Sequence, residues 1–162
     1  MLLVLLLLSG CGKNKIDRNP YFSSVSFNID LNLNLPAYDD LRYAGGGVSI
    51  RQGGINGLLV FNLNGNDFLA WEASCPNHSL KNCSKLSITG VLAECSCEGF
   101  QYSLATGQLI GCGGRSPEFT VTEGGIISEI VDDNNTKVNC ESIFPMIFYT
   151  VRRSGNTLFI SN

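Results

Sequence analysis

The positions of apolar residues along this chain follow a β-strand period rather than a helical one. From residue 25 to residue 35, apolar residues stand at every second position. An alternation of this length is typical of a strand with one buried face, and Pro36 closes it. Two further apolar segments, 57–63 and 67–72, flank the turn sequence Asn64-Gly65-Asn66. Asn-Gly between apolar segments is a strong hairpin signal, so these two segments are predicted to pair as antiparallel strands.

A second hairpin is predicted near the end of the chain, where segments 147–153 and 157–161 flank Ser154-Gly155-Asn156. No segment after residue 10 has the 3.6-residue period of an amphipathic helix, and no repeat or linker divides the chain. The sequence therefore predicts one all-β domain of small antiparallel sheets over residues 21–162. Shorter strands are predicted at residues 48–50, 86–88, 90–93, 119–121 and 126–127.

Composition and charge narrow the function. The chain has 162 residues, of which 44% are hydrophobic and 15% are charged, as suits one compact domain. Fourteen acidic residues against 11 basic ones give a net charge of −3, so no nucleic-acid partner is expected. His78 is the only histidine, which excludes any site that needs two imidazoles from this chain.

The N-terminus carries an export signal. Its first eight residues, MLLVLLLL, are too few to span a bilayer, which takes about 20 residues, but they suit the core of a signal peptide. This run ends in Leu8-Ser9-Gly10-Cys11, which resembles the lipobox of bacterial lipoproteins, in which cleavage before the cysteine leaves that cysteine acylated. The resemblance implies a signal peptide over residues 1–10 and a lipid on Cys11 that anchors the protein to a bacterial membrane, on the periplasmic or cell-surface side. Residues 11–20 are expected to form a polar tether, and the alternative is an unmodified Cys11.

Seven cysteines have to be explained, and a lipid on Cys11 leaves six. Exported thiols pair as disulfides unless a metal holds them. Four of the six lie with His78 in two short segments, each of which follows a predicted strand, so the sequence predicts two loops at one end of a small sheet. Such loops can build a metal site or a pair of disulfides. The segments are Cys75-Pro76-Asn77-His78 followed by Cys83, and Cys95-Ser96-Cys97-Glu98-Gly99.

Cys112 and Cys140 lie outside these two loops. Residues 132–137 between them are polar and typical of an exposed loop. A disulfide between Cys112 and Cys140 would tie that loop to the body of the domain. Connectivity does not follow from sequence alone, so this pairing stays open.

The two cysteine loops resemble those of the Rieske iron–sulfur family. Rieske domains use a Cys-x-His loop and a Cys-x-x-His loop, whose thiolates hold one iron of a [2Fe-2S] cluster and whose imidazoles hold the other. Residues 102–108, YSLATGQ, are similar to the segment that follows the second loop in that family, and the resemblance covers most of residues 55–112 and the final hairpin.

This resemblance implies a function and a set of site residues. It implies a [2Fe-2S] centre with Cys75 and Cys95 on one iron and with His78 and Glu98 on the other. It also implies a disulfide between Cys83 and Cys97 that joins the two loops. The expected role is electron transfer to a membrane-side or periplasmic protein partner, rather than catalysis of a reaction.

Two positions depart from the family pattern. The first loop is one residue longer, which would rotate His78 away from the iron unless the loop adjusts. Glu98 stands where the second imidazole belongs, and a carboxylate there adds negative charge and lowers the reduction potential. The alternative is a clusterless Rieske fold, closed by a disulfide between Cys75 and Cys95, that serves as a disulfide-stapled binding or structural lipoprotein.

Two other chemistries use the same loops. Zinc bound by Cys75, His78, Cys95 and Cys97 is disfavoured because the Cys-x-Cys spacing of the second loop is shorter than the Cys-x2-Cys spacing usual in structural zinc loops. A nucleophile made from Cys75 and His78 would need Glu98 to orient the imidazole and a thiol that stays reduced after export.

Overall fold

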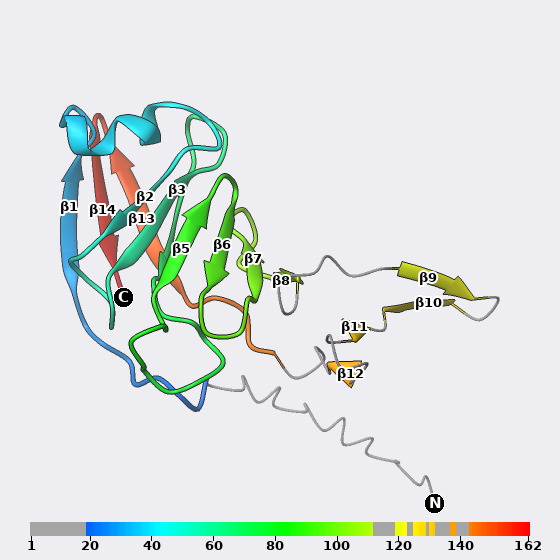
Figure 1. Ribbon diagram of the computed structural model, residues 1–162. Coiled ribbons are helices and arrows are strands. Elements are labelled where there is room, and N and C mark those ends of the chain that lie inside the picture. The colour runs from blue at the N-terminus through cyan, green and yellow to red at the C-terminus, as the bar shows by residue number, and fades with distance from the viewer. Residues whose placement is uncertain (1–18, 112–118, 123–124, 129, 132–136, 139–142) are drawn as a thin grey trace, which may run out of the picture.

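Two antiparallel sheets form the body of the protein. The computed structural model describes residues 19–111, 119–122, 125–128, 130–131, 137–138 and 143–162. The larger sheet has six strands in the order β1-β14-β13-β4-β3-β2, and every neighbouring pair is antiparallel (Figure 1). Its strands are β1 (Asn28–Asn32), β2 (Gly47–Ile50), β3 (Leu58–Asn62), β4 (Phe68–Glu72), β13 (Phe148–Ser154) and β14 (Thr157–Ser161).

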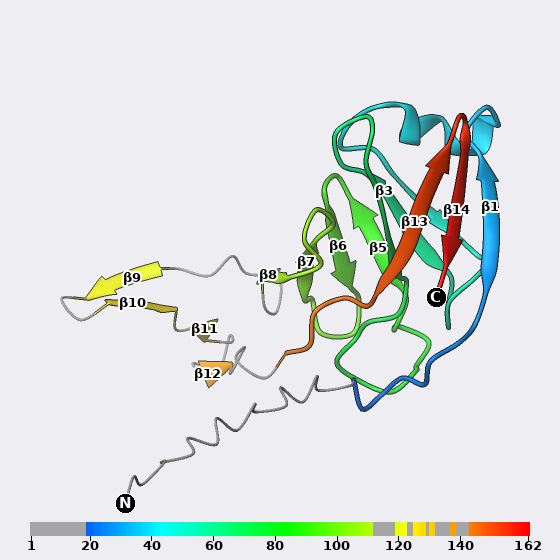
Figure 2. The same cartoon turned by 180° about the vertical axis from the view of Figure 1, so that it is seen from behind.

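The smaller sheet has four strands in the order β5-β6-β7-β8, again antiparallel. Two short strand pairs, β9–β10 and β11–β12, lie outside both sheets (Figures 1 and 2). The predicted fold class, all-β with small antiparallel sheets, is therefore confirmed. The remaining strands are β5 (Leu86–Thr89), β6 (Leu92–Cys95), β7 (Gln101–Ser103), β8 (Leu109–Gly111), β9 (Phe119–Thr122), β10 (Gly125–Ser128), β11 (Ile130–Val131) and β12 (Lys137–Val138).

Both predicted hairpins are present. Strands β3 and β4 pair with Val60 opposite Ala70, and β13 and β14 pair through the predicted turn at residues 154–156. In the first turn, the side-chain oxygen of Asn64 accepts hydrogen bonds from the backbone N–H groups of Asn66 (3.0 Å) and Asp67 (2.8 Å). Gly65 has a φ of 93° there, a conformation that glycine adopts without steric cost.

Several elements differ from the sequence prediction. Strand β1 begins only at Asn28 because its partner β14 ends opposite that residue. A short 3₁₀ helix, η1 (Pro36–Arg42), follows it and was not predicted, although Pro36 at its first turn favours a helix start. Strands β7, β8, β11 and β12 were also missed because they have only three, three, two and two residues, too few to show an alternation.

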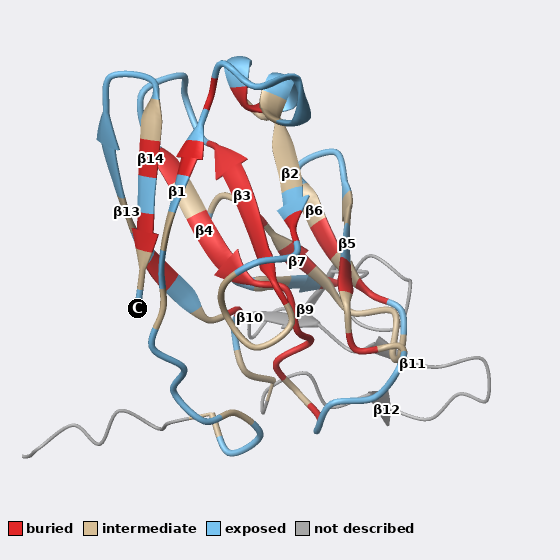
Figure 3. Ribbon diagram, turned by 90° about the vertical axis from the view of Figure 1, so that its left-hand side faces the viewer, coloured by how far each residue is buried: buried red, intermediate tan, exposed pale blue. Residues whose placement is uncertain are grey.

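Strand β3 lies between two apolar clusters, and every one of its residues is buried (Figure 3). A strand covered on both faces has an unbroken apolar sequence, which explains the run at residues 58–61. Leu58 and Val60 face a cluster that includes residues of β1 and β14. Leu59 and Phe61 face a second cluster, which includes residues of the four-stranded sheet together with Cys75 and Cys95. Cys75 and Cys95 are thus part of the core.

Glu72, the last residue of β4, is a fully buried carboxylate. It accepts hydrogen bonds from the backbone N–H groups of Ile55 (2.7 Å), Asn56 (3.0 Å) and Ser74 (3.0 Å) and from the hydroxyl of Tyr149 (2.8 Å). These partners come from the turn before β3, from β13 and from the start of the first cysteine loop. Glu72 therefore fixes the point where that loop leaves the sheet.

The predicted signal peptide and Cys11 lie outside the described residues, as do Cys112 and Cys140. No helix in the part of the chain that the structure describes is long and apolar enough to cross a membrane. Asn19 is the first described residue, and its side-chain Nδ2 donates a 2.6 Å hydrogen bond to the carbonyl oxygen of Pro76 in the first cysteine loop. The domain boundaries at residues 10 and 20 stay predictions.

Candidate metal centre

The first cysteine loop runs from the end of β4 to β5 and closes on itself. The backbone N–H of Cys75 donates to the carbonyl of Ser84 (2.7 Å), and that of Leu86 donates to the carbonyl of Ala73 (2.8 Å). Leu86 in turn pairs with Cys95 at the end of β6. Both loops therefore leave the four-stranded sheet at the same end, as the sequence predicted.

The second loop, between β6 and β7, is a tight turn. The backbone N–H of Gly99 donates to the carbonyl of Cys95 (2.7 Å), and the N–H of Cys95 donates to the carbonyl of Phe100 (2.8 Å). Gly99 has a φ of 70°, a value that favours glycine. The turn folds the chain back so that the carboxylate of Glu98 lies beside the sulfur of Cys95.

Two disulfides join the loops. Cys75 is bonded to Cys95 and Cys83 is bonded to Cys97, with Cα–Cα distances of 5.7 and 5.1 Å. The second is the pairing that the family resemblance implies, and the first is the pairing of the clusterless alternative. Cys75 and Cys95 have no exposed surface, so this disulfide is a buried part of the second apolar cluster.

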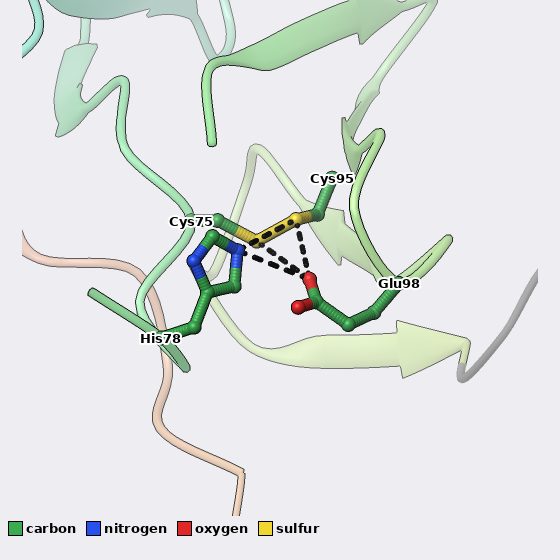
Figure 4. Close-up of side chains that lie close together, drawn as sticks. All are labelled: Cys75, His78, Cys95 and Glu98. Carbon is green, nitrogen blue, oxygen red and sulfur yellow. Dashed lines mark hydrogen bonds and ion pairs between the residues drawn. A yellow bond between two sulfur atoms is a disulfide. The ribbon is translucent and has the colours of Figure 1, made fainter. Parts of the chain in front are cut away.

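His78 and Glu98 close around the Cys75–Cys95 bond (Figure 4). Oε2 of Glu98 lies 3.1 Å from Nε2 of His78, 3.0 Å from Sγ of Cys95 and 3.7 Å from Sγ of Cys75. Nε2 of His78 lies 3.6 Å from Sγ of Cys95. One donor atom from each residue lies within 4.8 Å of the others, and we call these four residues the Cys–His–Glu site. The structure thus brings together all four predicted ligand residues, whereas Cys97 of the zinc alternative belongs to the other disulfide.

The ring of His78 is held by the first loop itself. Nδ1 lies 2.8 Å from the carbonyl oxygen of Ser79 and 3.3 Å from the hydroxyl oxygen of Ser84. With Nδ1–H donating to the Ser79 carbonyl, Nε2 is the ring nitrogen that faces Glu98 and the sulfur of Cys95, which is the usual orientation of a metal-binding imidazole. Ser79 and Ser84 were not identified from the sequence, because their role depends on how the loop closes.

Asn77 is the extra residue of the first loop, and its side chain binds groups that lie outside that loop. Nδ2 donates to the hydroxyl oxygen of Tyr102 (2.7 Å) and to the carbonyl of Phe144 (3.1 Å), and Oδ1 accepts from the backbone N–H of Phe144 (2.6 Å). The loop therefore adjusts to the additional residue, and His78 keeps its contact with Cys95. Burial raises the pKa of Tyr102, the hydrogen bond from Asn77 lowers it in part, and the charge of Glu98 raises it further.

With the Cys75–Cys95 bond closed, the Cys–His–Glu site has no room for the [2Fe-2S] cluster that the sequence resemblance implies. Such a cluster places two irons and their bridging sulfides between the thiolate pair and the second pair of ligands. Here the second pair is one imidazole and one carboxylate, and both lie within 3.6 Å of Sγ of Cys95, which leaves no room for iron and sulfide between the pairs. The arrangement instead gathers two sulfurs, one nitrogen and one oxygen within 4.8 Å of one another.

Comparison with known proteins adds little to this picture. No protein-family model matches the chain, and no curated protein matches its sequence. Among solved structures, the chain is similar to one described as a complex of reduced oxygenase and oxidized ferredoxin in carbazole 1,9a-dioxygenase. The two are 16% identical with a TM-score of 0.42, over 77% of this chain and 86% of that chain.

Proposed function

We propose that this chain is an exported, lipid-anchored Rieske-like protein whose two-loop end is a redox centre built on the Cys75–Cys95 disulfide. The observation that carries the proposal is the enclosure of this disulfide by an imidazole and a carboxylate, both within 3.7 Å of a sulfur. The sequence supports the export and the anchor through the lipobox that ends at Cys11.

The chemistry of the centre is a two-electron exchange. A dithiol reductant transfers two electrons and two protons to the Cys75–Cys95 bond, giving two thiols and leaving the reductant as a disulfide. Nε2 of His78 lies 3.6 Å from Sγ of Cys95, where a ring N–H hydrogen-bonds to the departing thiolate of Cys95, and such a bond favours the thiolate form. The Glu98 side chain is 30% exposed, so the reductant's approach is on the Glu98 side of the buried disulfide.

A second candidate is the one-electron [2Fe-2S] centre that the family resemblance implies. The convergence of Cys75, His78, Cys95 and Glu98 favours it, since these are the residues at the family's ligand positions. It requires reduced cysteines and loops that stand farther apart than they do in the structure.

A redox titration tests the proposal. The full-length protein in detergent is equilibrated with defined ratios of reduced and oxidised dithiol, alkylated after acid unfolding, and mapped by peptide mass. We expect Cys75 and Cys95 to be reduced and oxidised together as a two-electron couple. The ratio of the dithiol form to the disulfide form should then change tenfold for each ~30 mV of applied potential. The Cys83–Cys97 pair serves as the internal control.

Two results would overturn the proposal. Free Cys75 and Cys95 in the isolated protein, with two irons and two acid-labile sulfides per chain, would establish the [2Fe-2S] centre instead. A Cys75–Cys95 bond that stays oxidised while Cys83–Cys97 is reduced would show a purely structural staple.

A further inference from the structure

We propose that the reduced Cys–His–Glu site binds a single divalent metal ion of the zinc type and that oxidation of the two thiols releases it. The ligands are Sγ of Cys75 and Cys95, Nε2 of His78 and one carboxylate oxygen of Glu98. The inference rests on the proposed function in one respect, namely that the Cys75–Cys95 bond can be reduced.

The spacing of the donor atoms suits one ion. Around a tetrahedral zinc ion with bonds of about 2.0–2.3 Å, neighbouring donor atoms lie roughly 3.3–3.8 Å apart. Four of the distances between these donor atoms are 3.0, 3.1, 3.6 and 3.7 Å, and none exceeds 4.8 Å. The two distances from Oε2 of Glu98 that fall short of this range, 3.0 and 3.1 Å, do so by a few tenths of an ångström, whereas the two sulfurs lie far closer because they are bonded to one another. Cleavage of that one bond lets the sulfurs separate and leaves four donor atoms, all within 4.8 Å of one another, close enough to meet at a single ion.

The donor set and its surroundings also suit zinc. Two thiolates, an imidazole and a carboxylate are all ordinary zinc ligands. His78 already has the outer hydrogen bond that fixes a ligating imidazole, from Nδ1 to the carbonyl of Ser79. The sulfurs are fully buried while Glu98 is partly exposed, so the carboxylate lies on the solvent side, where an ion enters.

Metal binding and disulfide formation exclude one another because they use the same two sulfur atoms. In the reduced protein, one zinc ion replaces two thiol protons, which pass to solvent. When a small disulfide oxidises the thiolates, two electrons pass to that oxidant, which takes up two protons from solvent and becomes two thiols. The Cys75–Cys95 bond forms and the zinc ion is released with its charge unchanged. The site is thereby a redox-controlled zinc site.

The test measures metal binding without any activity. The full-length protein in detergent is reduced with a phosphine, freed of reductant without oxygen, and titrated with Co²⁺ and then Zn²⁺. We expect one ion per chain, thiolate-to-cobalt absorption in the near ultraviolet and tetrahedral cobalt bands in the visible, both lost when Zn²⁺ displaces Co²⁺. Addition of oxidised glutathione is then expected to release the zinc to a chelating dye.

Matched variants assign the ligands. Cys75→Ser is expected to abolish the cobalt spectrum, and Glu98→Gln to weaken Zn²⁺ binding by about tenfold or more. Glu94→Gln changes a half-buried carboxylate on β6, the strand that leads into the second loop, and Cys97→Ser removes a sulfur of the other disulfide. Both are expected to bind as the parent protein does, which separates this site from any other thiols of the reduced chain.

A thiol count on the same samples distinguishes the failures. Reduced Cys75 and Cys95 without a bound ion, or binding that survives Cys75→Ser, overturns the zinc site alone. A Cys75–Cys95 bond that resists reduction overturns the proposed function together with the zinc site.

Discussion

Tyr149 donates a 2.8 Å hydrogen bond from its hydroxyl group to Oε2 of Glu72, and both side chains are buried. Three backbone N–H groups donate to the same carboxylate, so all four partners are donors. Glu72→Gln turns one acceptor into an NH₂ group that faces these donors and is expected to lower the free energy of unfolding by about 2–4 kcal/mol. Urea unfolding measures the change. Tyr149→Phe, which removes a single donor, is expected to cost only about 1–2 kcal/mol, and an equal loss in both variants would contradict this account.

Alkaline pH is expected to destabilise the protein through two buried tyrosines. Burial raises the pKa of Tyr149, and the hydrogen bond to Glu72 and the charge of Glu72 raise it further. Burial is also the main cause of the raised pKa of Tyr102. The unfolded chain loses these protons near pH 10 while the folded protein keeps them. The stabilisation is therefore complete below pH 10 and is lost as the pH rises above it.

Urea unfolding at pH 8, 9, 10 and 10.5, under conditions that keep the disulfides intact, measures this loss. Tyr102→Phe and Tyr149→Phe are each expected to flatten the profile above pH 10. If the free energy of unfolding falls equally steeply with pH in the parent protein and in both variants, the alkaline loss of stability comes from other groups.

The sequence predicted those parts of the molecule whose partners are close along the chain. The Asn-Gly turn between β3 and β4 and the final hairpin are local, and the two cysteine loops follow strands that could be recognised. Glu72 could not be found in this way, because its partners are 16, 17 and 77 residues distant. Before folding, nothing distinguishes this carboxylate from an exposed glutamate at a strand end.

The candidate site shows the same limit. Its four residues could be chosen from cysteine spacing and family resemblance, but the distances between them depend on closure of both loops. Asn77 appeared as an extra residue that would turn His78 away. Its partner Phe144 is 67 residues distant, and only the folded chain shows that Asn77 joins the first loop to the segment before β13.

Gly107 has no room for a side chain. Its φ is 70°, and a Cβ atom would collide with the ring of Trp71, which is itself fixed by a 2.9 Å hydrogen bond from Nε1 to the carbonyl of Leu104. Gly107→Ala is expected to destabilise the protein by about 3 kcal/mol, combining the left-handed backbone with overpacking. Gly90→Ala is the matched control, since Gly90 has a φ of 61° and open space around it. Gly90→Ala is expected to lower the free energy of unfolding by about 1 kcal/mol. If thermal unfolding shows similar losses of stability in the two variants, a side chain at position 107 does not collide with Trp71.

Asn77 is expected to hold the segment before β13 against the first loop. Asn77→Ala removes three hydrogen bonds. The backbone N–H and carbonyl of Phe144 then lose their side-chain partner. A loss of about 2–3 kcal/mol is expected, with faster hydrogen exchange at the Phe144 amide. Asn34→Ala removes an exposed side-chain hydrogen bond to Asn156 and is expected to change stability by less than about 0.5 kcal/mol. Unchanged exchange at Phe144 would show that the segment is held by its other contacts.

Glu98→His tests whether this one carboxylate prevents a Rieske-type centre from forming. The substitution supplies a second imidazole at the family's ligand position, which replaces a negative ligand with a neutral one. After anaerobic reduction and reconstitution with iron and sulfide, we expect the parent protein to gain no [2Fe-2S] absorption. The variant is expected to approach two irons and two sulfides per chain. Glu94→His, on strand β6 just before the second loop, controls for iron bound by any added histidine.

The two contrary outcomes have different structural meanings. If Glu98→His gains no iron while the parent protein also has none, the longer first loop with Asn77 prevents the centre from forming. If the parent protein already binds as much iron and sulfide as the variant, Glu98 is a competent ligand and the loops separate on reduction. The cause of the clusterless state would then lie in the oxidation of Cys75 and Cys95, because a disulfide leaves neither sulfur free to bind iron.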